Sequence, residues 1–151
     1  MSILKGAAAG AAGTTALNAT TYLDMAVRGR PTSSTPEDTV EKLAGLAHVD
    51  IPGTGDEREN RVAGLGPLSG IATGVGVGAL LGLLQGLGWR PRLGASAVAA
   101  TVVALVGANG PMTALGINDP RTWPLESWVA DVVPHLAYGL VTAATLDGLD
   151  P

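Results

Sequence analysis

A row of glycines spaced four residues apart constrains this chain more than any other feature of its sequence. The row lies within residues 62–89, which carry no charged side chain, and its members are Gly66, Gly70, Gly74, Gly78, Gly82 and Gly86. Glycine is a poor helix former in water. In a bilayer the backbone must satisfy its own hydrogen bonds, and glycines four apart let two helices approach backbone to backbone. The row therefore predicts a membrane helix with a close helical partner.

The row cannot form one straight seam along its helix. Successive members are rotated by about 40° in a helix with about 3.6 residues per turn, so the row winds through about 200°. Either one partner helix crosses at an appreciable angle, or two partners use opposite ends of the row. Tight packing inside one bundle fits this geometry, and so does a pore or an interface between subunits.

The distribution of charge predicts the number of membrane spans. Four stretches lack charged side chains: residues 6–23, 62–89, 93–118 and 132–146. A spanning helix needs about 20 mostly apolar residues. We therefore predict a single all-α membrane domain over residues 1–151, a bundle of four transmembrane helices near residues 5–25, 64–88, 93–116 and 127–147. The alternative is a water-soluble bundle rich in Ala and Gly, which uncharged runs of this length disfavour.

The first of these stretches differs from the others in composition. Residues 6–23 contain seven Ala, three Gly and four Thr, and only three of their side chains are large and apolar. Such a helix gains little from contact with lipid tails. We expect it to be an inner helix that packs through Gly6, Gly10 and Gly13.

The loop over residues 26–61 is long for a small bundle and contains a helix start signal. Thr35 is the expected N-cap, Pro36 the first helical residue, and Val40, Leu43 and Leu46 form one apolar face. We predict a short interfacial helix that lies on the membrane surface or caps the bundle. Residues 52–60 are polar and predict a turn region.

Composition and motifs exclude several classes of function. The chain has no cysteine, so disulfides, Cys-ligated metals and thiol catalysis are excluded. Its net charge of −4 and the lack of a basic stripe argue against nucleic-acid binding. No catalytic, phosphate-binding or dinucleotide-binding motif is present. We therefore expect a protein that is not an enzyme and has no cofactor or metal.

Polar side chains within the predicted spans gather at one depth. Asn18, Asn109 and His135 all lie about 9–14 Å below the face that carries the first and third loops. Asp131 stands four residues before His135, and Tyr138 continues the same helical face. These groups suggest a transport or ligand site, because burying polar groups in a membrane is costly. The alternative is that His135 bonds a carbonyl or Asn109 and simply ties helices together.

Two further features lie at the predicted membrane interface. Asp24 and Arg28 are one helical turn apart and predict an ion pair at the end of the first helix. Trp123 and Trp128 suit the aromatic belt of a membrane protein. Together with Asp131 they also suggest a lipid or quinone site.

Three short segments carry a resemblance to a known group of proteins. They are GAAAGAAGTT at residues 6–15, RGRPTSSTPEDTVEKL at residues 28–43 and VPHLAYG at residues 133–139. The chain resembles uncharacterised small four-span membrane proteins of high-GC bacteria. The resemblance covers most of the chain, and it implies a topology but no activity.

These observations predict a cell-membrane protein that acts as a packing or accessory subunit. Its expected partners are the lipid bilayer and either further copies of itself or another membrane protein. A small channel or transporter using the polar layer is one alternative, and a lipid-binding or quinone-binding protein is another. The first and third loops carry more Lys and Arg than the other side of the membrane, which predicts that they are cytoplasmic.

Overall fold

The structure is a computed structural model, and it describes residues 2–149. In that range it contains five α-helices, one short 3-10 helix and no β-strand, so the predicted all-α class is confirmed. The elements in chain order are α1 (Ser2–Arg28), α2 (Thr35–Leu46), α3 (Asp56–Gly86), α4 (Leu93–Ala114), η1 (Pro120–Thr122) and α5 (Leu125–Leu149).

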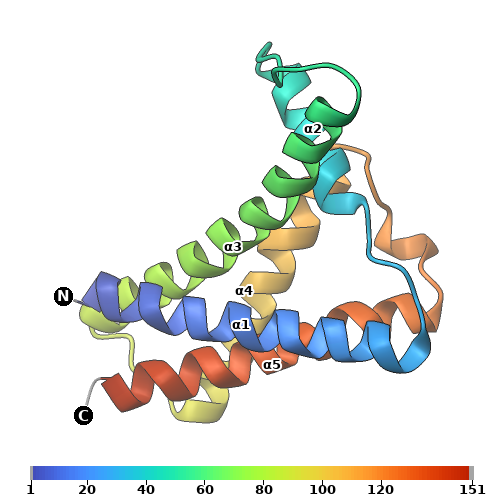
Figure 1. Ribbon diagram of the computed structural model, residues 1–151. Helices are drawn as coiled ribbons and strands as arrows, with labels where there is room; N and C mark the ends of the chain where they lie inside the picture. The colour runs from blue at the N-terminus through green and yellow to red at the C-terminus, as the bar shows by residue number, and fades with distance from the viewer. Residues whose placement is uncertain (1, 150–151) are drawn as a thin grey trace.

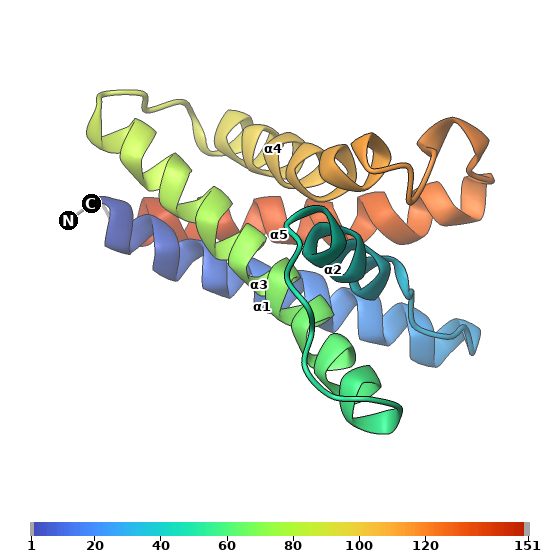
Figure 2. The same cartoon turned by 90° about the horizontal axis from the view of Figure 1, so that it is seen from above.

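Two antiparallel helices form the base of the fold. Helices α1 and α5 lie side by side and run in opposite directions, so both ends of the described chain lie together (Figure 1). Helix α4 flanks α5 on the side away from α1, and α3 crosses over α1 at a large angle (Figure 2). Helix α2 packs on the N-terminal part of α3, far from the chain ends. Helices α1 and α4 therefore both pack between α3 and α5.

The number of apolar spans differs from the expectation. Within residues 2–149, three helices are long and apolar enough to cross a membrane, namely α3, α4 and α5, whereas the sequence pattern predicts four. Helix α1 has 27 residues and is long enough. It falls short in hydropathy because Ala, Gly and Thr occupy positions that Leu, Val and Ile occupy in the other helices.

Helices α3 and α2 start at other residues than the sequence predicts. Helix α3 begins at Asp56, eight residues before the predicted start, so half of the predicted turn region is helical. The first turn of α3 contains Asp56, Glu57 and Glu59, and acidic side chains stabilise a helix N-terminus through its dipole. Helix α2 starts at Thr35 itself, and the N-cap position is taken by Ser34.

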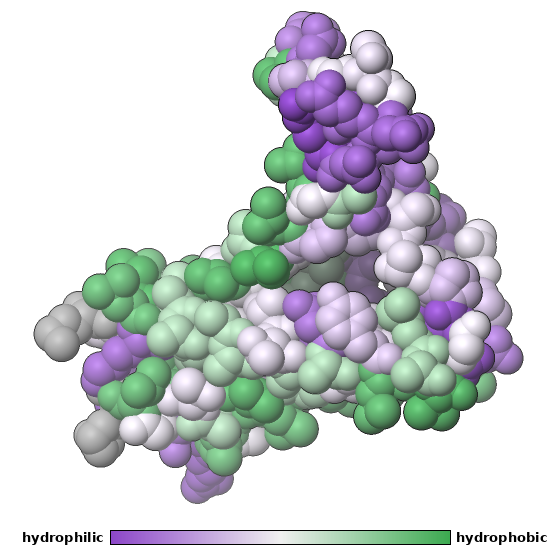
Figure 3. All heavy atoms as spheres, viewed as in Figure 1, coloured by the Kyte–Doolittle hydropathy of each residue, from purple (hydrophilic) through white to green (hydrophobic). Residues whose placement is uncertain are grey.

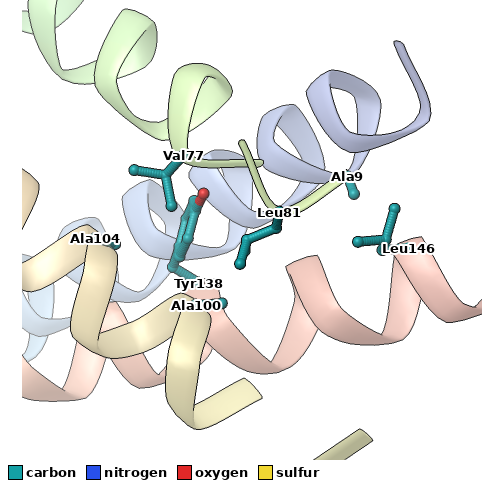
Figure 4. Close-up of a cluster of buried hydrophobic side chains, with 7 residues drawn as sticks. All are labelled: Ala9, Val77, Leu81, Ala100, Ala104, Tyr138 and Leu146. Carbon is teal, nitrogen blue, oxygen red and sulfur yellow. The ribbon is translucent and has the colours of Figure 1, made fainter. Parts of the chain in front are cut away.

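The core of the protein is built from small residues around one aromatic ring. Ala9, Ala100 and Tyr138 are fully buried, and Figure 4 shows the ring of Tyr138 in the centre of this cluster. The large aliphatic side chains mostly lie on the outside, and Figure 3 shows hydrophobic residues along the outward side of α3. Hydrophilic residues gather over α2 and the start of α3 (Figure 3). A small-residue interior and an aliphatic exterior suit an apolar solvent better than water.

Candidate functional site

Glycines of α1 and α3 bring the backbones of these two helices into close contact. A Cβ atom at Gly10 would lie 2.6 Å from the carbonyl oxygen of Gly74 and 3.0 Å from the Cα of Gly78. A Cβ atom at Gly82 would lie 2.7 Å from the Cα of Gly6. Real Cβ atoms essentially never approach other atoms this closely, so these positions accept only glycine while the two backbones keep their present separation.

The glycine row serves two different partners. Its C-terminal part, from Gly74 to Gly86, faces α1, whereas Gly66 faces α2, where a Cβ would lie 3.0 Å from Cδ of Glu37. Between them, a Cβ added at Gly70 would meet no neighbour within 4 Å, so this position is open. The row thus changes partner along its length, which is one of the two arrangements that its winding around the helix allows.

Three threonines extend the close packing to the other helices. Thr14 of α1 lies against Gly74 of α3, and Thr142 of α5 lies against Gly13 of α1. Thr101 of α4 lies against Gly139 of α5, where a Cβ would be 2.9 Å from the Thr101 nitrogen. The hydroxyls of Thr14 and Thr101 donate to carbonyls four residues earlier in their own helices. Each of these two hydroxyls therefore makes its hydrogen bond within its own helix, while the threonine side chain packs against a glycine of the neighbouring helix.

Tyr138 connects α5 to the glycine row. Its hydroxyl donates a hydrogen bond of 2.7 Å to the carbonyl oxygen of Gly74, and its side chain is fully buried. A ring of this size buries a large apolar area, and its hydroxyl needs a partner in a dry interior. Tyr138 therefore points toward α3 and is separate from the polar groups that precede it on α5.

A polar network joins α4, α5 and the loop between them. Asn109 donates to Oδ2 of Asp131 at 2.8 Å, and Asn118 lies 3.5 Å from the side-chain oxygen of Asn109. Thr113 donates to the side-chain oxygen of Asn118 at 3.0 Å. On the other side of Asp131, its Oδ1 lies 3.5 Å from Nδ1 of His135. The structure thus brings Asn109, Asp131 and His135 together and adds the loop residue Asn118 to them.

The hydrogen bond of His135 sets the chemistry of its ring. Nδ1 lies 2.7 Å from the backbone carbonyl oxygen of Asp131, and a carbonyl only accepts, so Nδ1 carries the hydrogen. In a neutral ring the remaining nitrogen, Nε2, is then an acceptor. His135 is 8% exposed, whereas the side chain of Asp131 keeps 22% of its surface accessible. The ring therefore has one anchored nitrogen, Nδ1, and presents Nε2 as a hydrogen-bond acceptor.

Asn18 lies at the level of this network but on another helix. Helices α1 and α5 are antiparallel, and Gly13 contacts Tyr138 and Thr142. Five residues further along α1, a rise of about 7.5 Å, brings Asn18 level with His135. Asn18 is half-buried and is not a member of the network.

The predicted interface groups lie at the same end of the molecule. Arg28 donates to Asp24 at 2.6 Å, and Arg30 donates to the same carboxylate at 2.5 Å, so Asp24 holds two guanidinium groups. Next to the network, hydrogen bonds from Arg121 hold the pKa of the Asp119 carboxyl below its ordinary value.

The two tryptophans at this end contact one another. The rings of Trp123 and Trp128 meet edge to face with centroids 5.2 Å apart. This pair stands where α5 begins, the position at which membrane helices collect aromatic residues.

Sequence reasoning missed two parts of this arrangement. The first is the role of Asn118, whose place in a turn gives no indication that it bonds Asn109. The second is the pairing of threonines with glycines of other helices, for which the only local signal is the presence of Thr in otherwise apolar helices. Among residues 2–149, no group of three or more His, Cys, Asp or Glu side chains is arranged to hold a metal ion.

Comparison with known proteins identifies no relative of this chain. No protein-family model, curated protein or solved structure matches the chain. The function is therefore inferred from the geometry described above.

Proposed function

We propose that this chain is an integral membrane protein that acts as a packing or accessory subunit, either in a homo-oligomer or in a larger membrane complex. The observation that carries the proposal is an unpartnered ridge on α4. Its members stand four residues apart, and all are exposed: Gly94, Val98, Val102, Val106 and Gly110. We call these five residues the α4 ridge.

The α4 ridge has the properties of a helix-packing surface. Side chains four apart form the rows that interdigitate when two helices pack, and the flanking glycines allow close approach. Valine has one strongly preferred rotamer in a helix, so it loses little freedom when a neighbour covers it. On the opposite side, α4 contacts Gly139 of α5 through Ala97 and Thr101. The ridge is therefore the face of α4 that another membrane helix can pack against.

In this proposal α1 also crosses the membrane, which gives four spans. Its 27 residues extend about 40 Å, enough to cross a hydrocarbon core of about 30 Å. It packs against α3 on one side and α5 on another, so it needs fewer lipid-facing apolar side chains than they do. Both the first and third loops then lie on one side of the membrane, which we take as the cytoplasmic side.

Disulfide crosslinking in membranes tests the accessory role. The chain has no cysteine, so Val102→Cys introduces a single thiol on the α4 ridge. We expect oxidation to produce a covalent dimer, or an adduct with one defined membrane protein. The matched control is Leu140→Cys, which places the thiol on an exposed position of α5 and gives no adduct. A monomer in native membranes, with no Val102→Cys adduct, would overturn the proposal.

A second candidate function is transport through the polar network. It is favoured by the acceptor nitrogen of His135, since a buried ring with one anchored nitrogen suits proton exchange. Under this function, His135→Ala reduces proton or cation flux into liposomes that contain the purified protein. The control is His48→Ala, which changes an exposed histidine outside the network. Absence of flux with the unaltered protein removes this candidate.

A further inference from the structure

A groove lies between the loop that follows α2 and the N-terminal part of α3. Its volume is about 420 Å³, within the range of about 300–1,000 Å³ typical of ligand pockets. Its apolar lining comes from the loop and from one side of α3, through Val49, Ile51, Pro52, Gly64, Leu65 and Leu68. We call this feature the α3 groove.

Polar contacts hold the loop beside α3. The guanidinium of Arg61 donates a hydrogen bond of 2.6 Å to the backbone carbonyl oxygen of Pro52, and it donates another of 2.6 Å to Glu57. Gly53 has a φ of 94°, a conformation that favours glycine, so the chain can turn directly after Pro52. A Cβ atom added at Gly64 would meet no neighbour within 4 Å. The loop is thus fixed along α3 without packing onto it at Gly64.

The apolar side chains of the α3 groove are largely exposed. Val49, Leu65 and Leu68 keep 61%, 41% and 58% of their surface accessible, and Ile51 is half-buried. Figure 3 shows hydrophobic residues on the side of α3 that reach up to the hydrophilic cap formed by α2 and the start of α3. A contiguous apolar surface rimmed by polar residues marks a place where a protein or a membrane is bound.

The position of the α3 groove along its helix identifies what covers it. Helix α3 is a candidate membrane span, and its uncharged stretch begins directly after Arg61. Leu65 and Leu68 lie about 6 Å and about 10 Å along the helix from this last charged residue. Residues 62–86 extend about 37 Å, more than a hydrocarbon core of about 30 Å, and a helix accommodates such an excess by tilting. The groove is therefore continuous with the lipid-facing side of α3.

We propose that the α3 groove binds an acyl chain of a membrane lipid, in the leaflet on the side of the first and third loops. An acyl chain is apolar and needs no hydrogen-bond partner, which suits the apolar lining. A helix with its side chains is about 10–12 Å across, so this volume would hold only about one turn of it.

The polar part of the lining fits the same orientation. Asp50, Asn60 and Arg61 also line the groove. Asn60 and Arg61 directly precede the uncharged stretch of α3, so this end of the groove lies toward the head groups, which a long arginine side chain can reach. This inference rests on the membrane residence in the proposed function, and it does not depend on whether the α4 ridge binds a partner.

Fluorescence quenching by lipid-borne nitroxides tests the proposal in vesicles. The chain has no cysteine, so Val49→Cys carries a single bimane fluorophore at the groove. The vesicles contain phosphatidylcholine with a nitroxide near the head-group end of its acyl chain. We expect the Val49→Cys label to lose most of its fluorescence. The control label is at Glu59→Cys, an exposed residue of α3 that does not line the groove, and it keeps its fluorescence.

A variant that fills the groove separates a bound chain from general contact with the bilayer. Gly64→Leu, combined with Val49→Cys, adds a side chain to the groove without changing its charge, and we expect it to remove the quenching. The matched control is Gly70→Leu, which changes another open glycine of α3 outside the groove and preserves the quenching. A label at Leu140→Cys, exposed on α5, stays quenched in both leucine variants and reports that the bundle remains in the membrane.

Three results would overturn the proposal. The first is a Val49→Cys label that escapes quenching while the Leu140→Cys label is quenched, because the groove then faces water or protein. The second is quenching that persists in Gly64→Leu, which shows a loop in contact with lipid but no chain in the groove. The third is a covalent dimer of Val49→Cys on oxidation, which assigns the groove to a second copy. If the Leu140→Cys label also escapes quenching, membrane residence itself fails, and this outcome is distinct from failure at the groove alone.

Discussion

The glycine contact between α1 and α3 and the polar network between α4 and α5 hold helices together by opposite means. In the first, the absence of side chains brings two backbones so close that a methyl group at Gly10 or Gly82 has no room. In the second, the side chains of Asn109 and Asp131 bond to one another at 2.8 Å. The first arrangement tolerates no added atom, whereas the second tolerates change because its members are only partly buried and bond to more than one neighbour.

The largest expected effect comes from breaking the glycine contact. Gly78→Ala places a methyl group against the backbone of Gly10, and neither helix can yield without losing its neighbours. We expect the free energy of unfolding to fall by about 2–3 kcal/mol, in the range of overpacked cores. The measurement is unfolding by SDS in mixed micelles.

The control for this change lies on the same helix. A methyl group added at Gly76 meets no neighbour within 4 Å, so Gly76→Ala leaves stability unchanged or raises it by up to about 1 kcal/mol. Equal losses in the two variants would show that the α1–α3 contact is not close-packed in the membrane.

An intermediate effect is expected from the hydrogen bond between Tyr138 and Gly74 in the small-residue interior. Tyr138→Phe removes the hydroxyl that donates to Gly74 and leaves that carbonyl without this bond. We expect a loss of about 1 kcal/mol, typical of one buried hydrogen bond. The same SDS titration measures it. Tyr22→Phe, at a residue that is 61% exposed, serves as the control and has no effect. A Tyr138→Phe variant as stable as this control would contradict the assigned bond.

The smallest effect is expected in the polar network. Asn109→Ala removes the donor to Asp131, but the carboxylate is only partly buried and still lies 3.5 Å from Nδ1 of His135. We expect a loss of about 0.6 kcal/mol, the average for hydrogen bonds between membrane helices. Asn18→Ala, which changes an asparagine outside the network, is the matched control for the same titration. If Asn109→Ala lowered the free energy of unfolding more than Gly78→Ala does, the polar network would stabilise the fold more than the glycine contact, contrary to our expectation.

Part of this arrangement follows from local sequence patterns. The four uncharged stretches predict where the long helices lie, because a charged side chain inside a span is costly. The polar residues before position 62 predict a turn, yet the acidic ones among them extend α3 because they favour its N-terminus. Residue spacing also places Asp131 and His135 on one face, since that relation depends on helix geometry alone.

The remaining relations depend on parts of the chain that are far apart. Tyr138 and Gly74 are 64 residues apart, and no local pattern indicates that one bonds the other. Asn118 joins Asn109 only because the loop after α4 folds back over the helix end. The pocket between the end of α3, the start of α4 and the end of α5 likewise forms only because these three helix ends meet.

The sequence by itself determined the helical class, the long apolar helices and the glycine row, because these depend on composition and on the period of one helix. The tertiary structure decided which helix each glycine faces: Gly74 to Gly86 face α1, Gly66 faces α2, and Gly70 remains open. It also decided that the polar groups divide between a network and a separate tyrosine bond. The physical reason is that glycine has no side chain that could favour one neighbouring helix over another. Only the way in which the helices cross determines which of them each glycine contacts.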